Sequence, residues 1–124
     1  MTAANLPLRD FDPRRLSALL GIVGPDDRLG FLDQLAADLS TCASQIVLTS
    51  QTSDWPGLRR ASHNLVALSG TCGAGALQAL AQTLNAAAHR QDHAALPGLI
   101  EAARTDIAAL AGHVQDLRHT GGTA

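Results

Sequence analysis

Residues 58–84 read LRRASHNLVALSGTCGAGALQALAQTL, and leucine and alanine recur there at the spacing of an amphipathic helix. The periodicity is interrupted once, between Gly73 and Gly75. The pattern therefore predicts two amphipathic helices joined by a short break. Long helices with short connections pack as antiparallel neighbours, so this stretch favours a helical bundle.

One histidine stands out on the first of these two helices. At about 100° per residue, the apolar side chains fall within a narrow arc, and His63 lies roughly 170° from its centre. We therefore expect His63 to face solvent. The residues around it on the outer face are basic, small or apolar: Arg59, Arg60, Val66, Ala67, Gly70 and, past the break, Ala74.

The stripe of Val66, Ala67, Gly70 and Ala74 on that face lacks the long polar side chains that normally cover a solvated helix. We interpret it as a surface on which another protein docks. The alternative is that His63 is simply one of five histidines in a water-exposed helix and has no role.

The composition limits the fold and the classes of function. The chain has 124 residues, enough for a single domain with one core. Alanine and leucine dominate, while strand-favouring residues are scarce. A net charge of −2 argues against nucleic-acid binding. No apolar run approaches the ~20 residues that span a bilayer, and the first residues do not resemble a secretory signal, so a cytoplasmic protein is expected.

Capping residues and apolar stripes divide the chain into five helices. Asp12 and Asp54 are the expected N-caps, each followed by a proline in the first turn. An apolar stripe that includes Leu29 marks the second helix, and residues 49–53 form a polar connection. The expected helices cover about residues 13–21, 27–48, 55–71, 75–90 and 96–118. They predict an all-α fold, an up-down antiparallel four-helix bundle with a short additional N-terminal helix.

The predicted domain organisation is a single domain over residues 1–124, with a core at about 10–118 and a disordered tail at about 119–124. Cys42 and Cys72 lie far apart in apolar patterns, where we expect free, buried thiols rather than a disulfide. His89 and His93 bracket a predicted turn without an obvious third ligand, so no metal site is expected. Asp92 and His93 are interpreted as turn and capping residues.

An exposed histidine can act as an acid–base catalyst, a metal ligand or a phosphoryl acceptor. Acid–base catalysis needs a pocket and an orienting carboxylate, and no Asp or Glu lies nearby in the sequence. A phosphoryl acceptor must instead protrude, so that another protein's active site closes over it. The pattern therefore favours phosphoryl transfer.

The same residues resemble the histidine-containing phosphotransfer (HPt) domain of bacterial phosphorelays. The family pattern is roughly A-H-x-L-K-G-x-x-x-x-x-G followed by a helix with inward leucines. In this chain the matching residues are Ser62, His63, Leu65, Gly70, Gly73, Ala74, Leu77 and Leu80. The lead-in DWPGLRRASH is also similar to that of such domains. The resemblance covers about residues 10–117.

The resemblance implies that Nε2 of His63 accepts and donates a phosphoryl group, without ATP-dependent kinase activity of the chain's own. It implies a response-regulator receiver domain or a hybrid sensor histidine kinase as partner, with Mg²⁺ on the receiver and no cofactor on this chain, which we expect to be a monomer. At the position of Asn85, some family members hydrogen-bond the other ring nitrogen. A solvated helix residue is the alternative there.

Two positions depart from the family pattern. The usual lysine three residues after the histidine is Val66, and the usual glycine after it is Ala67. Arg59 and Arg60 either supply positive charge from the preceding turn or are simply solvated. An HPt-like adapter that works without phosphorylation, or an unrelated helical scaffold or oligomerisation module, is the alternative function.

Overall fold

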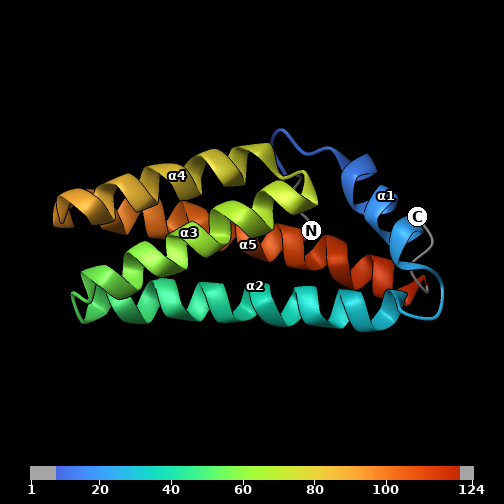
Figure 1. Cartoon of the computed structure of the whole chain (residues 1–124). Coiled ribbons are helices and arrows are strands. Elements are labelled where there is room, and N and C mark those ends of the chain that lie inside the picture. Colours follow the sequence, from blue (N-terminus) through green and yellow to red (C-terminus); the bar gives the residue numbers. More distant parts are fainter. Residues whose placement is uncertain (1–7, 121–124) are drawn as a thin grey trace.

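The structure, a computed structural model that describes residues 8–120, is built from helices (Figure 1). Its elements are α1 (Pro13–Val23), α2 (Arg28–Gln51), α3 (Trp55–Cys72), α4 (Gly75–Arg90), the 3-10 turn η2 (His93–Ala95) and α5 (Leu96–His119). Consecutive long helices run antiparallel, and α2, α3, α4 and α5 pack in that order, with α5 returning to α2. The predicted four-helix bundle with a short N-terminal helix is confirmed.

Aspartates begin the helices where the sequence predicts them. The Asp12 carboxylate accepts a hydrogen bond from the backbone N–H of Arg14 (3.1 Å), and Asp54 accepts one from the N–H of Gly57 (3.0 Å). Each bond satisfies one of the N–H groups that have no partner in the first turn of a helix. Asp92 does the same for the N–H of Ala95, which confirms its interpretation as a capping residue.

The second helix is longer than predicted. It continues through Gln51, so Thr49 is not part of a polar connection but a buried helical residue. Its hydroxyl donates to the Gln45 carbonyl (2.6 Å), which allows this polar side chain to be buried inside the helix packing. Leu29 was expected in the apolar stripe, yet it lies in the first turn of α2 and 51% of it is exposed.

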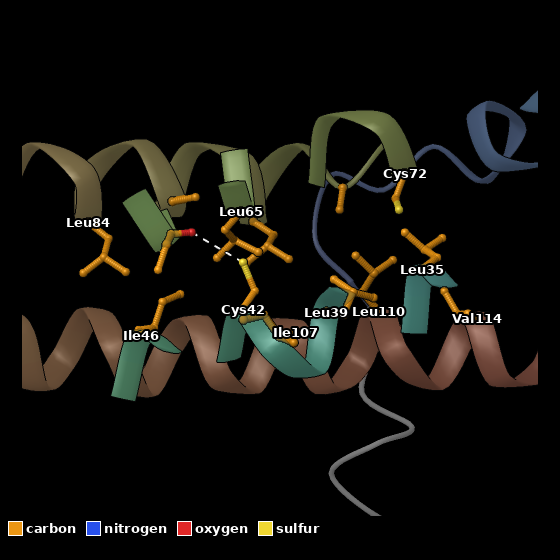
Figure 2. Close-up of a cluster of buried hydrophobic side chains, with 14 of the residues drawn as sticks. Leu35, Leu39, Cys42, Ile46, Leu65, Cys72, Leu84, Ile107, Leu110 and Val114 are labelled. Atoms are coloured by element: carbon orange, nitrogen blue, oxygen red, sulfur yellow. Dashed lines mark hydrogen bonds between the residues drawn. The ribbon is translucent and has the colours of Figure 1, made fainter. Parts of the chain in front are cut away.

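The core consists mainly of leucine side chains from all four long helices (Figure 2). Cys42 and Cys72 belong to it, and both are free, as expected. The Cys42 thiol donates to the Ala61 carbonyl (3.4 Å), the contact drawn in Figure 2. Burial raises the pKa of each thiol to about 11, so neither is a thiolate near neutral pH.

The segment before α1 returns to the turn between α3 and α4. The N–H of Asp12 donates to the Gly73 carbonyl (2.8 Å), and the N–H of Gly75 donates to the Asp10 carbonyl (2.9 Å). Phe11 lies opposite Ala74, which is fully buried. The prediction that Ala74 extends an exposed docking surface is therefore wrong, because the helical register ends at Cys72 and residues 8–12 cover the turn.

The C-terminal helix also exceeds its predicted length. It includes His119, which the sequence assigned to a disordered tail, while residues 121–124 of that tail lie outside the described part of the chain. An ion pair between Arg118 and Asp33 (2.6 Å) joins the end of α5 to α2. Within residues 8–120, no helix is both long and apolar enough to cross a membrane.

Candidate functional site

His63 lies on the outer face of α3 and is exposed, as its helical position predicts. Among residues 8–120, no side chain forms a hydrogen bond with its imidazole ring. Helix α3 is held at both ends, by the Asp54 cap and by Gly73, whose left-handed backbone (φ +76°) ends the helix. The ring is therefore presented to solvent from a helix that is capped at both ends.

Asn85 reaches from α4 toward the same turn of α3, but not to the ring. Its Nδ2 donates to the Arg59 carbonyl and to the Ser62 hydroxyl, both at 3.0 Å. In an α-helix the Arg59 carbonyl also accepts the backbone N–H of His63, four residues later. Asn85 therefore does not make the expected hydrogen bond to a ring nitrogen. It instead binds the backbone of the turn that carries His63.

A second amide from α4 supports the next turn of α3. Gln78 Nε2 donates to the Val66 carbonyl (3.3 Å) and passes so close to Gly70 that a Cβ there would collide with its amide. Position 70 therefore has no room for a side chain, because Gln78 occupies the adjacent space. Together with Asn85, Gln78 fixes the register between α3 and α4.

The predicted docking residues divide into three groups by exposure. Arg60 and Ala67 are exposed, and Arg59, Val66 and Gly70 are half-buried. Val66 packs partly against the core, whereas Ala74 is buried as described above. The accessible surface around His63 is consequently narrower than the sequence predicts, and it centres on Arg60 and Ala67.

Sequence reasoning missed an open groove of about 640 Å³ between α2 and α3, beside the turn that carries His63. Its lining includes Arg60, Asn64 and Ala67, which neighbour His63 in the sequence, and Asp54, the N-cap of α3. The facing side comes from α2: Asp38, Thr41, Gln45 and Thr49. These residues are three to four positions apart, so they form a polar stripe beside the apolar stripe of α2. The sequence alone contains this pattern.

The charges around His63 differ between its own helix pair and the groove, which Asp38 and Asp54 line. Helices α3 and α4 contain no aspartate or glutamate, although the chain has eleven acidic residues. Their charged side chains are Arg59, Arg60 and Arg90. A dianionic group on the His63 ring therefore meets no carboxylate on its own helix or on α4.

The other histidine pair does not form a comparable site. The His93 ring packs edge-on against Trp55, with ring centroids 4.7 Å apart, so it has a structural contact. Across residues 8–120, no three His, Cys, Asp or Glu side chains are grouped to hold a metal ion. The chemistry available at His63 is therefore that of an unpaired imidazole, a nucleophile toward a group brought from outside.

Comparison with known proteins gives one match. The sequence model of the Hpt domain matches residues 29–118, which is more than half of the chain and includes His63 and the whole four-helix bundle except its first and last residues. No curated protein and no solved structure matches the chain.

Proposed function

Because the chain belongs to the Hpt domain family, whose members act in phosphotransfer of two-component signalling, we propose that it relays a phosphoryl group through His63. The observation that carries the proposal is the exposed, unpaired ring of His63 on a helix capped at both ends. Family membership excludes the unrelated-scaffold alternative.

The proposed transfer needs no proton relay. The Nε2 lone pair of His63 attacks the phosphorus of a receiver's aspartyl phosphate, forming an N–P bond as the P–O bond to the aspartate breaks. The aspartate leaves as a carboxylate, and the ring keeps its proton on Nδ1. The reverse step returns the phosphoryl group to a receiver aspartate.

The partner is proposed to bring most of the catalytic groups. The sequence has no Gly-rich nucleotide loop with a lysine, and its nine basic residues are all arginines. The phosphoryl donor is therefore expected to be a receiver domain or a hybrid sensor kinase, partners with which Hpt domains interact. The Mg²⁺ required for the transfer is expected on the receiver, and none on this chain.

The docking surface is proposed to lie over His63 and the groove beside it. The short side chain of Ala67 leaves room for a partner next to the ring, and Arg60 contributes positive charge to the groove. A receiver's active site is acidic because it must bind Mg²⁺ through oxygen ligands. The lack of acidic residues on α3 and α4 favours its approach to His63, whereas Asp38 and Asp54 in the groove oppose it.

The test is phosphoryl transfer from a panel of phosphorylated receiver domains to the wild type and to His63→Gln. We expect an acid-labile, alkali-stable label on the wild type and none on the variant. Because His63 is exposed, the variant should keep its helical signal and its free energy of unfolding within about 0.5 kcal/mol. A large loss of helical signal would contradict the exposed placement.

An adapter that binds a receiver or kinase without phosphorylation is the second candidate, favoured by one observation. Val66 stands where the family pattern has a lysine, so a positive charge beside the phosphoryl group is missing. Receiver binding without any label, for every receiver in the panel, would support the adapter over the relay.

A further inference from the structure

Two amides on α4 fix how α3 and α4 lie against each other. Near one end of this seam, Gln78 donates to the Val66 carbonyl. Near the other end, Asn85 donates to the Arg59 carbonyl. Both contacts reach backbone atoms, so they set the axial register of the two helices and do not depend on a side-chain rotamer of α3.

A third amide, Gln82, lies between them. It follows Gln78 by four residues and precedes Asn85 by three, so it shares their face of α4. On α3, His63 follows Arg59 by four residues and precedes Val66 by three. Helices α3 and α4 run antiparallel (Figure 1). The contacts of Gln78 and Asn85 therefore place Gln82 and His63 at about the same level of the seam, and both residues are exposed.

Gln82 differs from its two neighbours in having no partner. Gln78 and Asn85 are half-buried and hydrogen-bonded, whereas Gln82 is exposed and forms no hydrogen bond with any of residues 8–120. Its two N–H donors are therefore available to a group that arrives at the level of His63. The chain has no lysine that could perform this role.

We propose that the Gln82 carboxamide donates a hydrogen bond to the phosphoryl group on His63, in place of the lysine missing at Val66; this rests on the proposed function. A phosphoryl dianion is a strong acceptor, and a hydrogen bond to an anion is stronger than one between neutral groups. The contact stabilises phosphohistidine relative to the free ring, because the donor has no competing partner in the unphosphorylated protein.

The test uses phosphoramidate, a small donor that phosphorylates histidine without any partner. Its P–N bond breaks as the bond to Nε2 forms, and ammonia leaves. Phosphorus NMR then follows the hydrolysis of phospho-His63, identified as the signal that His63→Gln lacks. We expect Gln82→Ala to shorten its lifetime about three- to tenfold, the effect of losing one exposed charge-assisted hydrogen bond.

Three further variants separate a direct contact from a structural effect. Gln82→Glu, of equal size but acidic, should shorten the lifetime further by repulsion, and Gln82→Lys should restore at least the wild-type lifetime. Gln34→Ala removes an exposed carboxamide on α2 that bonds only Asp38 and should leave the lifetime unchanged. Thermal unfolding should be the same for all the Gln82 variants, since the side chain is exposed.

Equal lifetimes for the wild type, Gln82→Ala and Gln82→Glu would overturn this inference while leaving the relay intact. The proposed function is tested apart from it, by label from receivers. A wild type that no receiver labels, yet whose phospho-His63 lifetime still depends on Gln82, would overturn the relay and support the Gln82 contact.

Discussion

The position of Val66 is subject to two demands, one from the hydrophobic core and one from the phosphoryl group on His63. The side chain is half-buried and packs partly against the core, so it contributes apolar burial. It also lies one turn after His63 on the α4-facing side, where a longer side chain would extend past the seam toward the ring. Stability and phosphoryl stabilisation therefore make opposite demands on this one position.

Replacing Val66 by lysine tests which demand matters more for transfer. We expect Val66→Lys to speed transfer or to prolong phospho-His63 about three- to tenfold, because an ammonium beside the phosphoryl oxygens stabilises their charge. The cost in unfolding free energy should stay near 1 kcal/mol, since the lysine stem covers part of the surface that valine covers. Rates of transfer and hydrolysis measured with one receiver check this.

Ala67→Lys is the matched control for Val66→Lys. It adds the same charge one residue later, but on the exposed surface beside the groove, where its bulk should hinder docking and slow transfer. If both lysine variants accelerate transfer equally, net charge rather than position is responsible. If Val66→Lys changes neither the transfer rate nor the hydrolysis rate, the valine does not impair phosphoryl transfer.

At the scale of elements, the turn between α3 and α4 decides where α3 ends. Gly73 has a left-handed backbone, and a Cβ built there would lie 2.5 Å from the Asp12 carbonyl oxygen and 3.2 Å from the Arg15 side chain. Glycine is thus required twice, once for the conformation and once for the close approach of the segment before α1.

Gly73→Ala is therefore expected to destabilise the protein by about 2–4 kcal/mol, through the strained backbone and the displaced segment. Gly30→Ala, in α2 with open space around its Cβ, should instead stabilise by about 0.5–1 kcal/mol. Urea unfolding of both variants measures the difference. A Gly73→Ala variant as stable as the wild type would show that residues 8–12 do not hold this turn.

The starts of α1 and α3 and the exposure of His63 could be predicted because they depend on local chemistry. Asp12 and Asp54 cap their helices within three residues, and periodicity alone turns His63 outward. The partner of Asn85 could not be predicted in this way, because it lies 26 residues away on another helix. Periodicity shows which face of a helix is apolar, but not which polar atom a neighbouring helix offers.

The same limit explains why the sequence analysis placed Ala74 on the surface and missed the groove beside His63. Ala74 is buried by a segment some sixty residues earlier in the chain, and no pattern within residues 58–84 contains that contact. The groove beside His63 arises from two helices together, so it is absent from an analysis of α3 alone. Both are properties of the assembled bundle.

At the scale of the whole molecule, the segment before α1 also closes the bundle against α5. The Phe11 ring packs edge-on against His113 of α5, with centroids 4.9 Å apart, and Arg9 pairs with Asp106 (3.3 Å). Burial lowers the pKa of His113, while the nearby Asp116 carboxylate partly opposes this effect. Packing of the segment before α1 against α5 therefore favours the neutral form of the His113 ring.

This placement predicts a loss of stability in mild acid. The unfolded His113 titrates near its usual value of 6.5 and the folded ring below it, so unfolding takes up a proton as the pH falls. The contribution of His113 is complete above pH 6.5 and declines as the pH falls through the folded pKa, by at most about 1 kcal/mol because the ring is partly exposed.

Urea unfolding of the wild type and of His113→Gln, between about pH 7.5 and pH 5, measures this dependence. The range stops above the ordinary titration of carboxylates, including Asp12, whose pKa is lowered further by Arg14. The two proteins should differ in stability by an amount that shrinks as the pH falls, because only the wild type loses the histidine contribution. A constant difference across the range would show that the Phe11–His113 contact tolerates the charged ring.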